Sequence, residues 1–184
     1  MEEKKLQEDI LSVLLTEEQL REKVSELGAR ITEDYRGKRP LFLGVLKGCF
    51  VFMADLMRSV ELPCSLDFMA VSSYGDGAST TGAVRITKDL SRDIEGEDVI
   101  IVEDILDSGV TLHYLRDYLT RRRPASVRIV TLLDKPERRR ADVRADYCGF
   151  TVPDEFVVGY GLDYAERYRN LPYIGVLKPD IYET

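Results

Sequence analysis

Strand-type stretches alternate with stretches of helical spacing along most of this chain. Apolar residues recur at helical spacing over 52–60 and again over 112–119. Each of these segments follows a strand-type stretch, and such alternation is typical of an α/β fold with a mainly parallel sheet flanked by helices. The predicted strands of that sheet are residues 41–46, 64–71, 99–102 and 125–133. The 99–102 run is wholly apolar and β-branched, as expected for a strand buried on both faces.

An amphipathic helix is predicted near the start of the chain, after a short edge strand at 8–15. Thr16 and Gln19 are spaced as a capping box, which satisfies two free backbone N–H groups at a helix start. The helix then carries one apolar stripe, formed by Leu20, Val24, Leu27 and Ile31. Gly37 is its predicted C-cap. No residue of this helix has an obvious chemical role, so we expect it to serve packing.

A dense group of acidic and hydroxyl residues follows the 99–102 strand. Glu103, Asp104 and Asp107 are expected in an acidic turn, and residues 108–111 then lead into a helix. In open α/β sheets, ligands bind beyond the carboxyl ends of the strands, and helix N-termini attract anions. Carboxylates can hold sugar hydroxyls and the loop can hold a phosphate, so a phosphorylated sugar fits. An ordinary turn is the alternative, because Asp-Ser-Gly is common in turns.

Two lysines follow other predicted strands of the same sheet. Lys47 comes with Gly48 directly after 41–46, which favours an anion site at this sheet edge, and Lys135 lies just past the end of 125–133. A surface lysine in a tight turn is the alternative for each. Residues 72–82 are polar and glycine-rich, which is typical of a loop tip. The arginine runs at 121–123 and 138–140 are expected to be solvated.

Composition limits the classes of protein to which the chain can belong. Its 184 residues carry 26 basic and 33 acidic side chains, and the net charge of −7 argues against a nucleic-acid-binding surface. No apolar run approaches the roughly 20 residues that cross a bilayer, and no signal-peptide pattern is present. We therefore expect one cytoplasmic domain without membrane contact. The three cysteines have no paired spacing and are expected to be reduced.

Four separated segments together resemble the type I phosphoribosyltransferases, and within them the hypoxanthine–guanine type. They are Leu46-Lys47-Gly48, Ser72-Ser73-Tyr74, residues 99–111 and residues 154–164, and they occur in the order of that family. The resemblance implies a single domain over 1–184 with the type I phosphoribosyltransferase fold. Its core is expected at about 16–145, and a small hood at about 146–184 together with the N-terminal segment. It also implies a homodimer or homotetramer.

The resemblance further implies a purine salvage reaction. The 5-phosphoribosyl group of phosphoribosyl pyrophosphate (PRPP) would pass to hypoxanthine or guanine, giving the nucleoside monophosphate and pyrophosphate. Asp107 would act as general base at purine N7. Lys135 would donate to purine O6, which favours a 6-oxopurine over adenine. The residues implied to bind PRPP are Glu103, Asp104, Asp107, Ser108, Gly109, Val110 and Thr111.

Further implied roles concern the base and a lid. Phe156 would stack on the purine, and the backbone of Val157 would contact its edge. The implied purine-binding residues are Lys135, Phe156, Val157 and Asp163. Ser73 and Tyr74 would belong to a mobile loop that closes over the site and excludes water from the cationic sugar.

The leaving group and a metal complete the implied site. Pyrophosphate would be bound by Lys47, Gly48 and Arg169, with a non-proline cis peptide at Leu46–Lys47. Mg²⁺ is the implied cofactor, because oxygen ligands completed by substrate phosphates suit this ion. Its candidate ligands are Glu103, Asp104 and Asp163.

Two other functions stay open. A phosphoribosyltransferase fold can also serve as a regulator that binds nucleotides and RNA or DNA; the two arginine runs favour this function, and the net charge of −7 opposes it. The other is a sister enzyme that prefers xanthine. Lys135, Phe156 and Asp163 favour an enzyme, since a pure sensor needs no purine-specific hood.

Overall fold

The computed structural model describes residues 3–73 and 84–183. None of the helices in these two ranges is long and apolar enough to cross a membrane. The elements, in chain order, are α1 (Glu3–Glu8), β1 (Ile10–Leu15), α2 (Glu17–Asp34), β2 (Leu41–Leu46), α3 (Phe50–Arg58), β3 (Ser65–Ser73), β4 (Val84–Lys88), β5 (Asp98–Leu106), α4 (Val110–Thr120), β6 (Ser126–Asp134), a 3₁₀ turn (Pro136–Arg138), β7 (Tyr147–Thr151), β8 (Val157–Val158), β9 (Ile174–Leu177) and α5 (Pro179–Tyr182).

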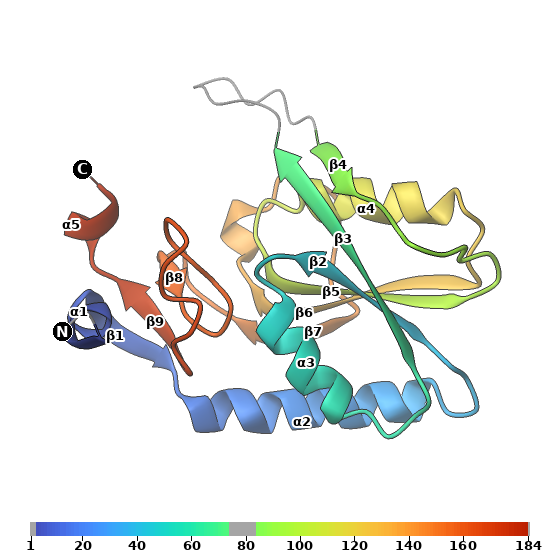
Figure 1. The fold of residues 1–184 in the computed structure, drawn as a ribbon, viewed down its shortest axis with the longest axis horizontal. Coiled ribbons are helices and arrows are strands. Elements are labelled where there is room, and N and C mark those ends of the chain that lie inside the picture. Colours follow the sequence, from blue (N-terminus) through green and yellow to red (C-terminus); the bar gives the residue numbers. More distant parts are fainter. Residues whose placement is uncertain (1–2, 74–83, 184) are drawn as a thin grey trace.

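A six-stranded sheet in the order β4-β3-β2-β5-β6-β7 forms the centre of the molecule. Its neighbouring strands are parallel except for β3 and β4, which pair antiparallel. Helices α2 and α3 lie on one side of this sheet and α4 lies on the other (Figure 1). The predicted α/β fold with a mainly parallel sheet is confirmed, and the carboxyl ends of β2, β5 and β6 come to one edge.

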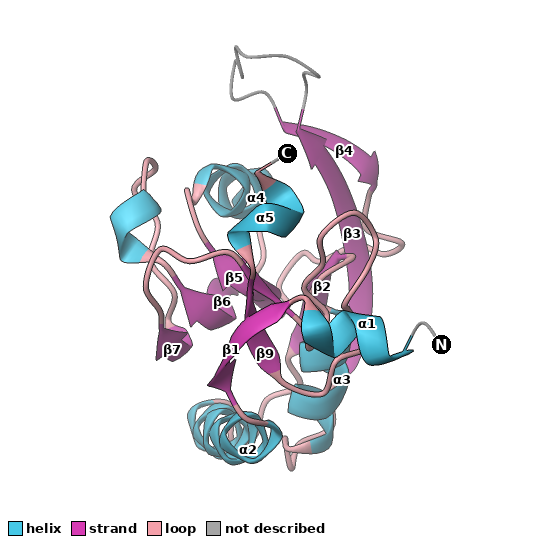
Figure 2. Ribbon diagram, turned by 90° about the vertical axis from the view of Figure 1, so that its left-hand side faces the viewer, coloured by secondary structure: helices cyan, strands magenta, loops and turns pink. Residues whose placement is uncertain are grey.

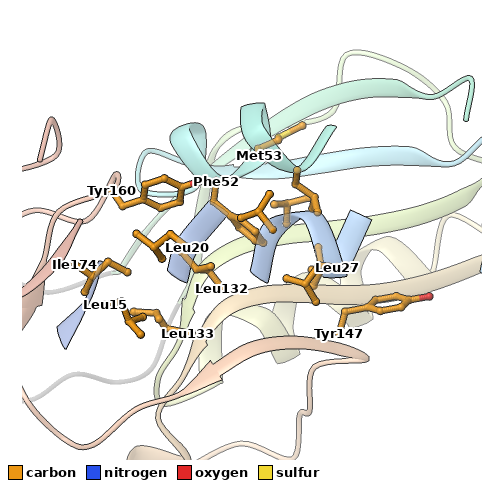
Figure 3. Close-up of a cluster of buried hydrophobic side chains, with 14 of the residues drawn as sticks. Leu15, Leu20, Leu27, Phe52, Met53, Leu132, Leu133, Tyr147, Tyr160 and Ile174 are labelled. Carbon is orange, nitrogen blue, oxygen red and sulfur yellow. The ribbon is translucent and has the colours of Figure 1, made fainter. Parts of the chain in front are cut away.

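The inner strands β2 and β5 are buried on both faces, because successive residues point to opposite sides and helices cover both sides of the sheet. Ile100 and Val102 pack with the helices α2 and α3, whereas Val99 and Ile101 pack beneath α4. The larger cluster includes Leu20, Leu27 and Phe52 from those helices (Figure 3). The apolar stripe predicted for 20–31 is therefore a packing surface, as expected.

A second, three-stranded sheet in the order β1-β9-β8 forms the hood. Strand β9 pairs antiparallel with both β1 and β8, so the first and last segments of the chain lie side by side (Figures 1 and 2). The predicted boundary between core and hood, at about residue 146, was wrong because it assigns β7 to the hood. Strand β7 instead pairs in parallel with β6 and closes the edge of the central sheet, because Tyr147 is buried against α2.

Two local predictions are tested at the ends of elements. The capping box of α2 is present, with Thr16 accepting from the Gln19 N–H and the Gln19 side chain accepting from the Thr16 N–H. The prediction of Gly37 as the C-cap was wrong, because Tyr35 is the C-cap. Gly37 lies two residues further on at φ +77°, where it turns the chain toward β2.

Candidate active site

The acidic pair lies inside a strand rather than in a turn, which corrects the expectation from sequence. Strand β5 continues to Leu106 because its parallel pairing with β6 extends through Glu103–Thr131 to Leu106–Asp134. Asp104 is 9% exposed, and its Oδ1 accepts a hydrogen bond of 2.8 Å from the Ile105 N–H. Only Asp107 of the three carboxylates lies beyond the strand. The sheet therefore fixes the backbone of Glu103 and Asp104.

Burial disfavours the ionised form of both adjacent carboxylates, Glu103 and Asp104. Burial and the neighbouring charge of Asp104 raise the pKa of Glu103 well above its ordinary value. Burial likewise raises the pKa of Asp104, although its hydrogen bonds act in the opposite direction. A bound cation would favour the ionised form of both carboxylates, and an oxygen-only donor set suits Mg²⁺. Among the described residues no group of three or more His, Cys, Asp or Glu side chains converges to hold a metal, so water or substrate oxygens would have to complete the coordination.

The loop that follows β5 is built to present backbone N–H groups. Gly109 adopts φ +79° as the N-cap of α4, and a Cβ there would lie 2.5 Å from Val143 Cγ1. The first turn of a helix leaves N–H groups without an intrahelical partner, which suits an anion. Residues Ser108, Gly109 and Thr111 line a cavity of about 280 Å³ together with Glu103, Asp104 and Asp107. The predicted PRPP-binding residues thus come together, with Val110 as the first helical residue.

The arginine run after β6 lies beside the site. Arg138 and Arg140 are exposed, as expected, but the expectation of a solvated side chain was wrong for Arg139, which is 19% exposed. Arg139 pairs with Asp134 and also donates to the Val143 carbonyl at 3.1 Å. The N–H of Arg140 donates to the Ser108 carbonyl at 2.8 Å, which braces the loop that follows β5. Arg138 pairs with Asp154 at 2.5 Å and lies 3.8 Å from Asp107 Oδ2. Sequence alone did not indicate these contacts, because they depend on how the chain folds back after β6.

A second cavity, of about 390 Å³, lies between the central sheet and the hood. The predicted purine-binding residues Lys135, Phe156, Val157 and Asp163 all line it. Lys135 is only 6% exposed and donates to the Glu155 carbonyl, and burial lowers its pKa. A solvated turn lysine is therefore excluded.

Asp107 and Ile105 line both cavities. The Oδ1 atom of Asp107 is buried and has no hydrogen-bond partner within the described residues. Since Asp107 lies at the junction, one carboxylate faces the space proposed for the sugar and the space proposed for the base.

Phe156 has an aromatic neighbour that the sequence did not single out. The Tyr182 ring of α5 stacks on it, with centroids 4.7 Å apart and planes 20° from parallel. The Tyr164 ring meets it edge-on at 5.5 Å. Phe156 remains 37% exposed, and Tyr182 lines the same cavity. Helix α5 therefore forms part of the wall of the cavity between the central sheet and the hood.

The turn after β2 lies directly against the acidic pair. Its Leu46–Lys47 peptide bond is cis, as the family resemblance implied. A Cβ on Gly48 would lie 1.7 Å from Asp104 Oδ2, so the main chain of Gly48 touches that carboxylate. On the other side, a Cβ on Gly161 of the hood would lie 2.3 Å from the Gly48 carbonyl oxygen. The turn is thus held between strand β5 and the hood.

Three charged residues predicted for the site, Lys47, Asp163 and Arg169, form ion pairs near this turn. Arg169 Nη2 lies 2.9 Å from Asp163 Oδ1, and its Nη1 donates to the Gly161 carbonyl at 2.8 Å. Lys47 Nζ lies 2.9 Å from Glu166 Oε1, a contact that lowers the pKa of Glu166. Arg169 also lines a separate cavity of about 980 Å³ beside α2 and α3, which holds none of the other predicted site residues.

The predicted lid falls largely outside the described residues. Ser73 is the last residue of β3, and nothing is described of its side chain. Tyr74 lies outside the described ranges. Their roles therefore stay predictions.

Comparison with known proteins agrees with this arrangement. The model of the phosphoribosyl transferase domain family matches residues 12–165. The chain is 56% identical over 179 residues to the hypoxanthine-guanine phosphoribosyltransferase of Bacillus subtilis, covering 97% of this chain and 99% of that protein.

Two further relatives show how far the similarity extends. The chain is 58% identical over 174 residues to the bifunctional protein TilS/HprT of Listeria monocytogenes, but spans only 27% of its length. A crystal structure of a hypoxanthine phosphoribosyltransferase from Staphylococcus aureus superposes with a TM-score of 0.94 at 53% identity, covering 97% of each chain. With its fold, its motifs and these relatives in agreement, the chain belongs to the hypoxanthine-guanine phosphoribosyltransferases of the phosphoribosyl transferase domain family.

Proposed function

We propose that this phosphoribosyltransferase transfers the 5-phosphoribosyl group of PRPP to hypoxanthine or guanine in purine salvage. The observation that carries the proposal is the position of Asp107, which lines both the cavity beside the phosphate loop and the cavity beneath the hood. A bond between sugar and base has to form where these two spaces meet. The buried lysine of the second cavity, Lys135, supplies the donor that a 6-oxopurine requires.

Each group of the site has one task in this reaction. The C1′–O bond to pyrophosphate breaks and the C1′–N9 bond forms, so positive charge develops on the sugar and negative charge on the leaving group. Lys47 and Arg169 stabilise the leaving group electrostatically. Asp107, which lies where the two cavities meet, takes the proton at purine N7. Lys135 stabilises the charge that moves onto O6.

The sugar is positioned by the end of strand β5 and by the loop that follows it. Glu103 and Asp104 accept hydrogen bonds from the ribose hydroxyls, and the 108–111 loop holds the 5′-phosphate. Mg²⁺, when bound, would supply positive charge that neutralises the carboxylates and the substrate phosphates. Glu103 and Asp104 fit it best, whereas Asp163 already accepts from Arg169 and from the Glu166 N–H at 2.9 Å.

A steady-state assay tests the proposal. The chain is supplied with PRPP, Mg²⁺ and one base at a time: hypoxanthine, guanine, xanthine, adenine or uracil. We expect turnover of hypoxanthine or guanine, with adenine and uracil inert. Faster turnover of xanthine would replace the substrate assignment, and tight nucleotide binding without turnover of any base would favour a regulator.

We also infer a cytoplasmic location and a homodimer or homotetramer. The three cysteines Cys49, Cys64 and Cys148 are free, which suits a reducing compartment. Light scattering on the purified chain gives the number of subunits, and cell fractionation gives the location.

A further inference from the structure

Glu166 occupies a position between the two cations assigned to pyrophosphate. Its Oε1 lies 2.9 Å from Lys47 Nζ and 3.6 Å from Arg169 Nη2. Lys47 belongs to the turn after β2, while Arg169 and Glu166 belong to the hood segment 119 or more residues later. The proposed mechanism gives Glu166 no role. One carboxylate thus bridges two positive charges that come from opposite sides of the site.

The backbone holds Glu166 in place while leaving its side chain free to move. Tyr164 and Arg167 pair across a two-residue turn, in which Ala165 has φ +50° and Glu166 has φ +60°. Positive φ at both central residues is the type I′ geometry of tight hairpins. The Glu166 N–H donates to Asp163 Oδ2 at 2.9 Å, which fastens the turn. The Glu166 side chain is 66% exposed, so it can swing away from Lys47 without disturbing the core.

We propose that Glu166 is an affinity-determining residue of the pyrophosphate subsite: its carboxylate occupies the two cations when the subsite is empty and must leave them when pyrophosphate binds. The inference rests on the proposed function, because it takes Lys47 and Arg169 as pyrophosphate ligands. When pyrophosphate binds, its ion pairs with Lys47 and Arg169 replace those of Glu166, and the negative charge of Glu166 stays close to the bound anion. Its affinity is lowered and its release is made faster.

The size of the effect follows from the exposure of the contact. Ion pairs between exposed side chains are weak, and the loss of one competing pair corresponds to about a fivefold change in affinity. Repulsion between Glu166 and the bound anion acts in the same direction and is screened by solvent. We therefore expect removal of the Glu166 charge to tighten pyrophosphate binding between about threefold and tenfold.

Titration calorimetry with inorganic pyrophosphate and Mg²⁺ tests the inference. Glu166→Gln should bind pyrophosphate about fivefold more tightly than the unchanged chain, and Glu166→Asp, which keeps the charge, should lie between them. Glu95→Gln is the matched control, because Glu95 forms an exposed ion pair with Arg123 at 3.0 Å, and both residues lie in loops at the amino ends of β5 and β6, the opposite edge of the sheet from the site. It removes the same charge and should leave the affinity unchanged.

The kinetic counterpart is product inhibition. With hypoxanthine as the base, pyrophosphate should inhibit Glu166→Gln at lower concentrations than it inhibits the unchanged chain, and the KM for PRPP should fall. Equal or weaker pyrophosphate binding by Glu166→Gln, with thermal unfolding unchanged, would overturn the inference. Absence of pyrophosphate binding by the unchanged chain would instead overturn the proposed function, so the two failures are distinct.

Discussion

Substitution of Gly48 by alanine gives a sharp test of the site geometry. Gly48 does not adopt positive φ, so its backbone conformation is open to alanine. The obstacle is space, because the new Cβ would lie 1.7 Å from Asp104 Oδ2 and 2.7 Å from Asp104 Cγ. Ordinary non-bonded contact is about 3.5 Å, so one partner must move by roughly 1.8 Å. The hood at Gly161 restrains the turn, so the displacement falls largely on the Asp104 carboxylate.

That displacement allows an estimate of the loss of activity. Misplacing a substrate-positioning group by about 1 Å can lower the rate by about 100-fold. We therefore expect Gly48→Ala to lower kcat/KM for PRPP by at least about 100-fold, measured with saturating hypoxanthine, while the chain stays folded.

Gly37→Ala is the control for the glycine-to-alanine change. A Cβ there meets nothing within 4 Å, although φ is +77°. It should cost about 1 kcal/mol of stability and leave kcat/KM unchanged. If Gly48→Ala kept kcat/KM within about threefold of the unchanged chain, the contact between Gly48 and Asp104 would not position the ribose, and the reasoning would fail.

Three further predictions concern the general base, the recognition of the purine and the stability of the fold. Asp107→Asn should lower kcat by about 10²–10⁴-fold while nucleotide still binds in calorimetry, and an unchanged kcat would remove Asp107 from the mechanism. Lys135→Gln should reduce the preference for hypoxanthine over adenine at least about tenfold in competitive kcat/KM assays, because an amide can also accept a hydrogen bond; unaltered discrimination would contradict the O6 assignment. Burial alone would raise the pKa of Asp67, but N–H donors from Ser91 and Phe68 and the charge of Lys88 leave it lowered. Asp67 therefore stabilises the fold above the unfolded-state pKa of about 3.9, and this contribution is lost as pH falls through the lowered pKa. Asp67→Asn should cost about 2 kcal/mol in urea unfolding at neutral pH and almost nothing in strong acid, with exposed Asp142→Asn as control; a cost that did not depend on pH would contradict the assignment.

Local patterns in the sequence were sufficient for four strands of the central sheet, β2, β3, β5 and β6. Strands β2, β5 and β6 appear as apolar runs because their residues are buried on both faces, and the stripe on α2 appears because one helix face packs on the sheet. The order of polar segments after these strands then predicted one site, since parallel strands bring their carboxyl ends to one edge.

Contacts between distant segments were decided only by the tertiary structure. Strand β5 extends over Glu103 and Asp104 because β6 pairs with it there, although two acidic residues have little tendency to form a strand by themselves. The ends of the chain meet in the hood through β1 and β9, and no local signal reports that pairing.

The same distinction holds within the site. The residue types that can bind phosphate, sugar and base occur in short motifs, so the sequence by itself predicted many of the residues that line the two cavities. The meeting of both cavities at Asp107, the ion pairs of Arg138 and the contact of Glu166 with Lys47 depend on long-range packing. Side-chain neighbours across 100 residues are set by sheet register and by hood closure, which no local periodicity encodes.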